Sequence, residues 1–414
     1  MRADVIVLGA GMIGVSAALA LQARGRKVVL IDRRPAAEET SYGNSGLIQR
    51  EGVVPYGFPR DWGKILKAAL NLGPQSNLHW RAVPWLAPFL YQYWRHGTPE
   101  RLAATARAAK PLVERSLAEH EGLMEPAGIA SLPRRTGYLK VYRSEAALAE
   151  ELDCDEAARR QWGVTSEAKS AAEIRALEPH LSGRIAGGVM MPQPWSVADP
   201  SAVGKAYADL FMRRGGTFVT ADAGTLQATA EGWQVQRVEG PLTAREVVVA
   251  LGPWSDAVLR RLGVRLPLFV KRGYHMHYHV QGNAALSRPV IDGENGYLLT
   301  AMTRGIRLTT GAEFAIHGAP PTPVQLAKVE PVARALFPLA ERAETTPWLG
   351  SRPCLPDMLP VIGEVPGRRG LWIDCGHHHL GFTLGPVSGR LLAEMMTGAE
   401  PLTDPAPYRV ARFG

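Results

Sequence analysis

The stretch that decides the fold is DVIVLGAGMIGVSAALALQARGRKVVLIDRR, residues 4–34. It begins with a continuous apolar run, DVIVLGAG, which predicts a strand buried on both faces, as in a parallel sheet. The small-residue segment GMIGVSAALALQARG predicts a helix that ends near Gly25, because glycine commonly terminates helices. A second apolar run, KVVLIDRR, predicts another buried strand. The segment is therefore a βαβ unit, which favours a Rossmann-like α/β domain.

The turn between the first strand and the helix carries the pattern G-x-G-x-x-G, as Gly9, Gly11 and Gly14. Alone this pattern is weak, but here it follows a strand, opens a helix and precedes a strand that ends in Asp32. Glycines let backbone N–H groups approach a pyrophosphate, and an acidic residue after the second strand can bind ribose hydroxyls. We therefore predict a dinucleotide site. One alternative is a dinucleotide whose ribose carries a 2′-phosphate, because Arg33 could bind that phosphate. The other alternative is a glycine turn that binds no ligand.

Later segments alternate between two kinds of pattern. REVVVALGPWS (245–255) and LWIDCG (371–376) predict further buried strands, whereas KRGYHMHYHV (271–280) and IRLTTGAEF (306–314) alternate with period two and indicate an antiparallel sheet. The two kinds are interleaved along the chain, so we expect two discontinuous domains. The dinucleotide-binding domain is predicted over 1–56, 196–262 and 345–414, and a second, mainly antiparallel-sheet domain that binds substrate over 57–195 and 263–344.

Composition excludes several classes of protein. The chain has 414 residues, 46% hydrophobic and 21% charged, which is typical of a soluble globular protein with more than one domain. It shows no run of 18 apolar residues and no signal-peptide pattern. The net charge of +8 is spread without the clusters that indicate nucleic acid. Cys154, Cys354 and Cys375 form neither a disulfide framework nor a zinc pattern, so we expect a reducing, cytoplasmic compartment.

Three consecutive histidines, His377, His378 and His379, stand in DCGHHHLGFTLGP (374–386). Imidazole is a common metal ligand. However, adjacent residues point apart on both helices and strands, so three in a row do not converge easily on one ion. We therefore expect no metal at this segment.

Four further segments carry recognisable patterns. They are TSYGNSG (40–46), similar to T-S-x-x-N-S/A-G; ALGPWS (250–255), similar to A-x-G-x-x-S; LGSRPCLPDMLPVIG (349–363), similar to G-x-R-P-x-x-P-D-x-x-P-x-I/V-G; and CGHHHLGFTLGPVSGRLL (375–392), similar to a G-H-x-x-x-G-x-T loop. Together they resemble the D-amino-acid oxidase superfamily of flavoproteins, and within it the bacterial D-amino-acid dehydrogenases. The likeness runs from residue 5 to about 395 in the family's order, but residues 55–190 match only loosely.

The resemblance implies non-covalent FAD in a Rossmann-like domain of the D-amino-acid oxidase or glutathione-reductase type. Cys354 and Cys375 raise the covalent attachment known in sarcosine oxidases, but neither aligns with the attachment position. The motifs and the resemblance together give the expected cofactor-binding residues: Gly9, Gly11, Met12, Ile13, Gly14, Asp32, Arg33, Ser41, Asn44, Ser45, Gly46, Leu47, Ala223, Gly252, Trp254, Gly376, His378, His379, Leu380, Gly381, Phe382, Thr383 and Leu384.

The resemblance also implies a substrate site. Arg352 matches the family's carboxylate-binding arginine, and Tyr297 matches a strand tyrosine that helps to bind the carboxylate. Tyr274 lies on a neighbouring strand of the expected pocket, and His377 matches the family histidine near the flavin. Either tyrosine could instead be packed in the core, and Arg272 is expected to be structural rather than catalytic.

The predicted activity is that of an FAD-dependent dehydrogenase acting on CH–NH donors. It would oxidise D-amino acids, including cyclic ones such as D-proline or hydroxy-D-proline, by hydride transfer from Cα to flavin N5, and water would hydrolyse the imine. A quinone or another electron-transfer acceptor is expected. The alternatives are a glycine- or sarcosine-type oxidase that uses oxygen, and a partner-dependent subunit of a multi-chain amine dehydrogenase.

Two segments in the region of 57–96 leave a membrane contact open. DWGKILKAAL (61–70) and VPWLAPFLYQYWRHG (83–97) combine basic residues and tryptophan with apolar residues, as interfacial segments do. Peripheral contact with the inner face of a membrane is one interpretation, and a lid or a subunit interface is the other.

Overall fold

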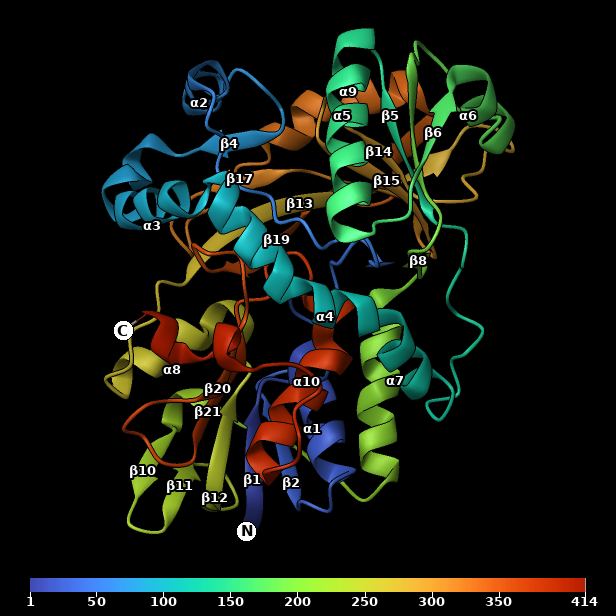
Figure 1. Cartoon of the computed structure of the whole chain (residues 1–414). Coiled ribbons are helices and arrows are strands. Elements are labelled where there is room, and N and C mark those ends of the chain that lie inside the picture. Colours follow the sequence, from blue (N-terminus) through green and yellow to red (C-terminus); the bar gives the residue numbers. More distant parts are fainter. Residues whose placement is uncertain (414) are drawn as a thin grey trace.

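Two β-sheets form the framework of the computed structural model, which describes residues 1–413 (Figure 1). The first sheet, low in Figure 1, has the order β10-β11-β12-β1-β2-β9, and β21 with β20 joins it along the second half of β12. Five of its strands are parallel, as the buried apolar runs predict. The strands are β1 Arg2–Leu8, β2 Val28–Asp32, β9 Thr217–Thr220, β10 Gln227–Thr229, β11 Gly232–Val235, β12 Leu242–Val249, β20 Val361–Glu364 and β21 Leu371–Cys375.

The predicted βαβ unit is confirmed as β1, α1 (Met12–Gln22) and β2. β1 is paired on both sides, with β2 and β12, so its interior residues are fully buried. The helix ends at Gln22, slightly before the expected glycine. Gly25 adopts φ of +76° and turns the chain toward β2, because glycine accepts this left-handed conformation without steric cost.

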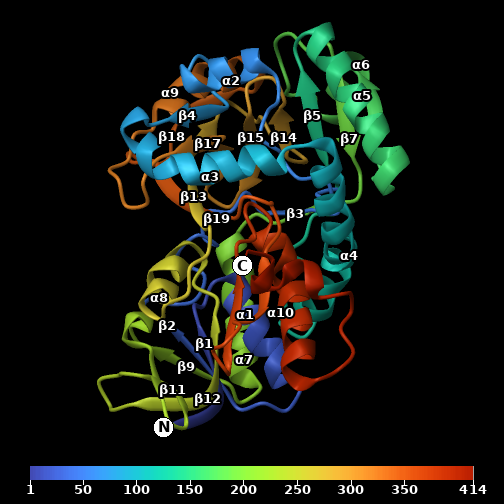
Figure 2. The ribbon, with the colours of Figure 1, turned by 60° about the vertical axis from the view of Figure 1, so that its left-hand side comes forward.

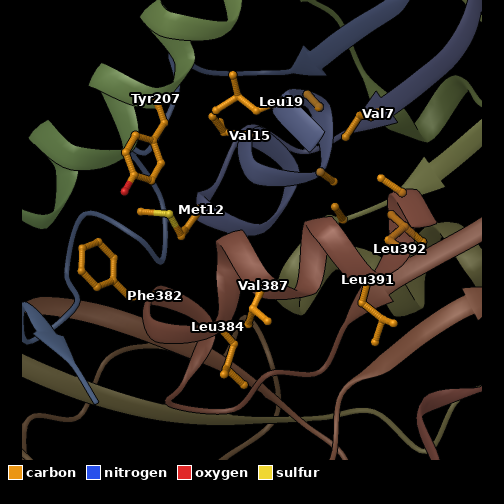
Figure 3. Close-up of a cluster of buried hydrophobic side chains, with 14 of the residues drawn as sticks. Val7, Met12, Val15, Leu19, Tyr207, Phe382, Leu384, Val387, Leu391 and Leu392 are labelled. Carbon is orange, nitrogen blue, oxygen red and sulfur yellow. The ribbon is translucent and has the colours of Figure 1, made fainter. Parts of the chain in front are cut away.

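Three helices cover one face of the first sheet: α1, α7 (Pro200–Arg213) and α10 (Gly381–Thr397). Figure 3 shows the side chains between them, with Tyr207 of α7, Val15 and Leu19 of α1, and Leu391 of α10 in one apolar cluster. α8 (Ser255–Arg261) packs on the opposite face. Both faces of the sheet are therefore buried, which explains why its strands are apolar throughout.

α1 and α10 approach each other closely through glycines. A Cβ on Gly385 would lie 2.6 Å from Met12 Cγ, and a Cβ on Gly389 would lie 2.6 Å from the Ala17 nitrogen. Side chains at these two positions would force the helices apart, at a cost typical of overpacking, about 1–3 kcal/mol. The segment after β21 is thereby held against the helix that follows β1.

The second sheet has eleven strands in the order β4-β17-β13-β16-β15-β14-β5-β7-β6, with β18 and β19 also paired to β13. Most pairs are antiparallel, as predicted, and β14–β5 and β17–β4 are parallel. The strands are β4 Ser76–Leu78, β5 Tyr138–Tyr142, β6 Glu167–Ser170, β7 Gly187–Met191, β13 Phe269–Val280, β14 Val290–Asp292, β15 Tyr297–Met302, β16 Gly305–Thr309, β17 Ala312–Phe314, β18 Leu339–Arg342 and β19 Trp348–Cys354.

Helices surround the second sheet, and two short strands, β3 (Leu47–Ile48) and β8 (Trp195–Ser196), pair beside it. These helices are α2 Trp62–Ala69, α3 Val83–His96, α5 Glu145–Trp162, α6 Ala171–Leu177 and α9 Val324–Leu336. The remaining helix is α4 Pro99–Met124, and the 3₁₀ turns of the whole structure are η1 Trp80–Ala82, η2 Ala223–Thr225, η3 Gly252–Trp254, η4 Ala406–Tyr408 and η5 Val410–Phe413. Within residues 1–413, no helix has both the length and the apolar character needed to cross a bilayer.

The division into two domains stays a prediction. Two elements, however, pack with the sheet that their predicted segment does not belong to. β19 follows the boundary at 345 but belongs to the antiparallel sheet. α4 falls in the predicted substrate segment, yet it descends beside α10 and α7 of the first sheet (Figure 2). His120 of α4 bonds to the Tyr207 hydroxyl at 3.0 Å and to the Phe382 carbonyl oxygen at 2.9 Å. Partners distant in sequence fix both elements, so local patterns could not place them.

Candidate active site

One cavity of about 900 Å³ is lined from both sheets. Its walls include the turn after β1, the loop after β21, and residues of β13, β15 and β19. Ligands of open α/β sheets bind outside the carboxyl ends of the strands, and this volume is in the upper range for cofactor and small-molecule sites. The cavity is therefore the candidate site for both a cofactor and a substrate.

The glycine turn after β1 forms one end of the cavity. Gly9 has φ of +103°, and a Cβ on Gly14 would lie 1.7 Å from the Gly9 carbonyl oxygen. α1 therefore starts directly against the end of β1, with no acidic side chain in its first turn. The Ser41 hydroxyl accepts a hydrogen bond from the Met12 N–H at 3.0 Å. A helix N-terminus of this kind is suited to bind an anion such as a pyrophosphate.

Asp32, at the end of β2, lines the same end of the cavity. One carboxylate oxygen accepts a hydrogen bond from the Ala10 N–H at 2.7 Å, and the other accepts one from the Arg34 N–H at 3.1 Å. The Arg33 guanidinium lies 4.7 Å from the centroid of the Trp254 ring, and both residues line the cavity. The turn thus holds the carboxylate in place beside a flat aromatic and cationic wall.

The segment after β2 brings small residues to the middle of the cavity. Asn44 accepts a hydrogen bond from the Gly46 N–H at 2.8 Å, which closes a tight turn. A Cβ on Gly43 would lie 2.0 Å from the Trp348 ring, so only glycine permits this contact. His275 stacks on the same indole, with ring centroids 4.7 Å apart and an interplanar angle of 15°. The cavity wall therefore combines backbone with stacked rings.

The three histidines have different surroundings. His377 Nε2 lies 2.9 Å from the Ser388 hydroxyl, so this ring is tied to α10. Both ring nitrogens of His378 are buried without a hydrogen-bond partner in residues 1–413, and burial holds its pKa well below the usual value. The His379 ring lies 5.0 Å from the Tyr56 ring, and burial lowers its pKa to about 3. His378 and His379 therefore line the cavity as neutral groups at neutral pH, and the absence of a metal at the three histidines stays a prediction.

One group of three metal-type side chains occurs elsewhere in residues 1–413, at His275, His277 and Glu344. His277 Nδ1 lies 2.6 Å from Glu344, and its Nε2 accepts a hydrogen bond from Arg307 Nε at 3.0 Å. Both nitrogens of His277 are therefore engaged, and a guanidinium occupies the position from which a cation would approach. We assign no metal to this group.

Arg352 projects from β19 into the cavity. Its guanidinium donates hydrogen bonds to the carbonyl oxygens of Gly311 and Thr310, at 3.2 and 3.4 Å. It lies across Gly273, where a Cβ would be 2.6 Å from Nη2. No carboxylate in residues 1–413 forms an ion pair with it, and burial lowers its pKa. A partly buried guanidinium with only carbonyl partners is suited to bind an anionic ligand.

Both predicted tyrosines line the cavity, and both hydroxyls have protein partners. Tyr274 donates to Glu313 at 2.9 Å, and the same carboxylate pairs with the buried Arg272 at 2.7 Å. The Tyr297 hydroxyl accepts a hydrogen bond from Arg143 at 3.2 Å. Burial raises the pKa of both phenols above the usual value. They are therefore fixed, neutral groups at physiological pH.

The cavity brings together most of the residues selected from the sequence. Those that line it are Gly9, Gly11, Met12, Ile13, Asp32, Arg33, Ser41, Asn44, Ser45, Leu47, Ala223, Gly252, Trp254, Tyr274, Tyr297, Arg352, Gly376, His377, His378, His379, Gly381 and Phe382. Gly14, Gly46, Leu380, Thr383 and Leu384 do not line it. These five lie behind the wall: Thr383, for example, accepts a hydrogen bond from the Gln49 N–H at 3.1 Å.

Residues 4–395 match the model of the family described as "FAD dependent oxidoreductase". The chain belongs to this family. It is 29% identical to a D-amino-acid oxidase of Bradyrhizobium diazoefficiens, with 99% of this chain and 98% of that protein covered. It is 31% identical to a D-amino acid dehydrogenase of Cereibacter sphaeroides, with 99% and 95% covered.

Among solved structures, the fold is similar to glycine oxidase from Geobacillus kaustophilus, with TM-score 0.74, 23% identity and 99% of both chains covered. It is also similar to L-proline dehydrogenase from P. horikoshii, with TM-score 0.74, 17% identity, and 100% and 98% covered. At these identities the likeness shows the fold alone. The predicted fold class, a Rossmann-like FAD domain with an antiparallel-sheet part, is confirmed.

The residues present in this FAD-dependent oxidoreductase fit the cofactor. The glycine turn is closed to any side chain at Gly9, where a Cβ would lie 2.4 Å from the Ala250 carbonyl oxygen. The open space beyond it is thus bounded by backbone, which a pyrophosphate requires for close approach. Asp32 would hold the ribose, and the segment from Gly376 to Gly381 would face the flavin. Cys354 and Cys375 are buried free thiols whose pKa values burial raises, which disfavours the thiolate.

Sequence reasoning missed several residues that line the cavity. Lys271 precedes Gly273 by two positions on β13, so period-two alternation could have placed it on the same face. Lys140 and Glu151 also line the cavity, where they form an ion pair with an N–O distance of 2.8 Å. Tyr56 lies in the loosely matching segment and carries no local signal. These side chains come from separate elements, and only the tertiary structure brings them to one cavity.

Asp32→Ala should weaken FAD binding. The substitution leaves the Ala10 N–H without its acceptor and removes the expected ribose contact, and each loss of this kind costs about 1–3 kcal/mol. We expect FAD affinity to fall by roughly 10- to 100-fold, measured from the fluorescence of FAD released on dilution. Asp4→Ala is the matched control, because this exposed carboxylate also accepts a backbone hydrogen bond but does not line the cavity. Equal FAD retention in both variants would contradict the assignment.

Proposed function

We propose that this FAD-dependent oxidoreductase is a dehydrogenase of D-amino acids. The relatives cited above that carry the names D-amino-acid oxidase and D-amino acid dehydrogenase are 29–31% identical over nearly the whole chain. The single observation that carries the proposal in this chain is the state of Arg352. It is a partly buried guanidinium, bound only to carbonyl oxygens, at a cavity whose other end fits FAD. A carboxylate is the ligand that such a fork binds at two points.

The protein's own contribution to the reaction is mainly orientation. FAD, when bound, supplies the two-electron acceptor, so the chain needs to hold the amino acid with its reacting carbon in a fixed place. Arg352 would anchor the carboxylate, and the two carbonyl oxygens that it contacts fix the direction of the guanidinium. Precise placement of this kind accounts for a large share of rate enhancement when no difficult proton transfer is required.

Four further side chains complete the proposed site. His379 has its pKa lowered to about 3 by burial and by the nearby cations, so at neutral pH it can donate or accept a hydrogen bond without adding charge. Tyr297, oriented by Arg143, would contact the substrate carboxylate. His377 is turned toward Ser388, so we propose that it positions the loop rather than exchanging protons. Tyr274 is held by Glu313 and would shape the wall.

The proposal is tested by anaerobic reduction of the purified holoprotein. D-amino acids, their L-enantiomers, cyclic imino acids and N-methyl amines are mixed in turn with the enzyme without oxygen, and bleaching of the flavin absorption is followed. We expect D-amino acids to bleach the flavin and L-enantiomers not to. Reoxidation by dyes or quinones should be much faster than by oxygen. Bleaching only by glycine or sarcosine, with peroxide formed at the rate of turnover, would favour an oxidase instead.

Arg352→Ala should abolish most activity while FAD stays bound. Removing one partner of a buried ion pair costs roughly 3–5 kcal/mol, and each 1.4 kcal/mol is about tenfold. We therefore expect kcat/KM to fall by about two to four orders of magnitude, with kcat also reduced because the substrate is misplaced. Arg352→Lys keeps the charge without the fork and should lie between wild type and alanine.

The control for this series is Arg304→Ala. Arg304 is half exposed and pairs with Glu344 at 3.3 Å, outside the cavity, so its loss should change kcat/KM little. Rates are measured as anaerobic flavin reduction at low substrate after the flavin content is confirmed. A rate for Arg352→Ala within a few-fold of wild type would show that Arg352 is not the carboxylate anchor.

We propose further that electrons leave to a quinone at a membrane surface. Large apolar side chains are exposed on α2, η1 and α3: Trp62 is 78% exposed, Trp80 58% and Trp85 69%. Lys64 and Lys67 lie among them on α2. Exposed tryptophans beside basic residues favour an anionic lipid interface, and a lid or a subunit interface remains the alternative.

Liposomes that contain anionic lipid should co-sediment the protein at low salt, and high salt should weaken the binding because charge contributes to it. A variant with Trp62→Ser and Trp85→Ser should lose most of the binding and keep its flavin. Failure of the wild-type protein to bind at low salt would remove the membrane proposal.

A further inference from the structure

Lys271 is a buried cation that no part of the proposed reaction uses. It lies on β13, only 9% exposed, and lines the cavity. Its ammonium group is 4.0 Å from the centroid of the Tyr93 ring and 5.5 Å from that of Phe314. Within residues 1–413 its ammonium makes no ion pair and no hydrogen bond to a side chain. The cavity therefore contains a second cation without an anion.

The acidic side chains near Lys271 are already paired. Glu313, on the strand beside β13, forms a bond of 2.7 Å with Arg272, which points to the other side of the strand. Asp292 pairs with Arg143 at 2.9 Å, and Glu151 with Lys140 at 2.8 Å. Acidic side chains thus pair with the other cations around the cavity, whereas Lys271 and Arg352 have no acidic partner.

The two unpaired cations stand directly opposite each other. Lys271 and Arg352 are register partners on the antiparallel strands β13 and β19. Like charges in such positions destabilise a sheet, and burial of each charge is unfavourable without a counterion. The interaction of an ammonium with aromatic rings is much weaker than the cost of burying that charge without an anion. Two such cations are best neutralised by a ligand that carries more than one negative charge.

The two charged groups lie against different neighbours. The Arg352 guanidinium lies over Gly273, two residues beyond Lys271 on the same face of β13. The Lys271 ammonium lies instead beside the rings of Tyr93 and Phe314, so a ligand that carries two carboxylates can contact both cations. Both cations also act on the same group, since Arg352 and Lys271 lower the pKa of His379, after burial as the main cause. They therefore face one region of the cavity.

We propose that Lys271 binds a second carboxylate and that the preferred substrates are amino dicarboxylates. Arg352 binds the α-carboxylate. Lys271, whose ammonium lies against the rings of Tyr93 and Phe314, binds the second carboxylate at the acidic end of the substrate. The inference rests on the proposed function for the α-carboxylate and adds the substrate class. The second carboxylate can come from an acidic side chain, as in D-aspartate and D-glutamate, or from an N-carboxymethyl group.

The decisive comparison uses D-glutamate and D-glutamine, which differ in charge but little in shape. For the wild-type holoenzyme we expect kcat/KM for D-glutamate to exceed that for D-glutamine by about 10- to 100-fold, the range for one charge-assisted contact. Lys271→Met should collapse this ratio toward one, and Lys271→Arg should retain most of it. D-aspartate and iminodiacetate, assayed beside them, distinguish a side-chain carboxylate from an N-carboxymethyl group.

The matched control is Lys205→Met, which removes the same charge from an exposed ion pair with Glu38 and should leave the ratio unchanged. The flavin spectrum and sulfite affinity of each Lys271 variant are recorded as well. If the variants alter these and keep the substrate ratio, Lys271 serves the cofactor and the inference is wrong.

Two wild-type results separate the inference from the function beneath it. Neutral D-amino acids that react as fast as the dicarboxylates would overturn the inference alone. Failure of every D-amino acid to bleach the flavin would overturn the proposed function. Because both use the wild-type enzyme, the test holds even if a variant folds poorly.

Discussion

The close approach of backbone to backbone at the start of α1 is the constraint on which the structure depends. A Cβ on Gly14 would occupy the position of the Gly9 carbonyl oxygen, and a Cβ on Gly389 would collide with the backbone at Ala17. With glycine at these positions, α1 rests directly on β1 and α10 rests directly on α1. The loop that precedes α10 is thereby held over the carboxyl end of the first sheet, where the helix N-terminus faces the cavity. Larger side chains would separate the layers and open the cofactor site.

The second sheet contributes the substrate side of the cavity through side chains rather than backbone. β13 and β19 pair along the whole of β19, and this register places Lys271 opposite Arg352 and Gly273 opposite Gly350. The glycine leaves room for the guanidinium, and the buried pair of Arg272 and Glu313 fixes the strand from behind. The cavity thus combines a helix end suited to bind an anion with two cations that have no acidic partner, and the three histidines also line it.

How far the sequence predicts this site depends on how local each feature is. The glycine turn, Asp32 and the strand–helix order are local, and the structure confirms that order and places the turn and Asp32 at the cavity. Lys271 escaped notice because its meaning depends on a strand more than seventy residues away in the chain, which brings Arg352 opposite it. Tyr56 and Lys140 were missed because they come from a stretch without a recognisable pattern. Backbone turns such as the glycine turn leave a pattern in neighbouring residues, which the sequence shows. The side chains of the pocket are brought together by contacts between distant segments, which leave no local pattern.

The sequence by itself determined the parallel and antiparallel parts, the dinucleotide turn and the resemblance that identifies the cofactor. These features follow from the periodicity of apolar residues and from the spacing of glycines. Both are properties of residues that are close together in the sequence. Only the tertiary structure decided that β19 joins the antiparallel sheet, that α4 packs on α10, and which charges in the cavity lack partners. The physical reason is that an ion pair and a strand pair are satisfied across space. Whether a buried charge is free to bind a ligand depends on every segment that folds around it.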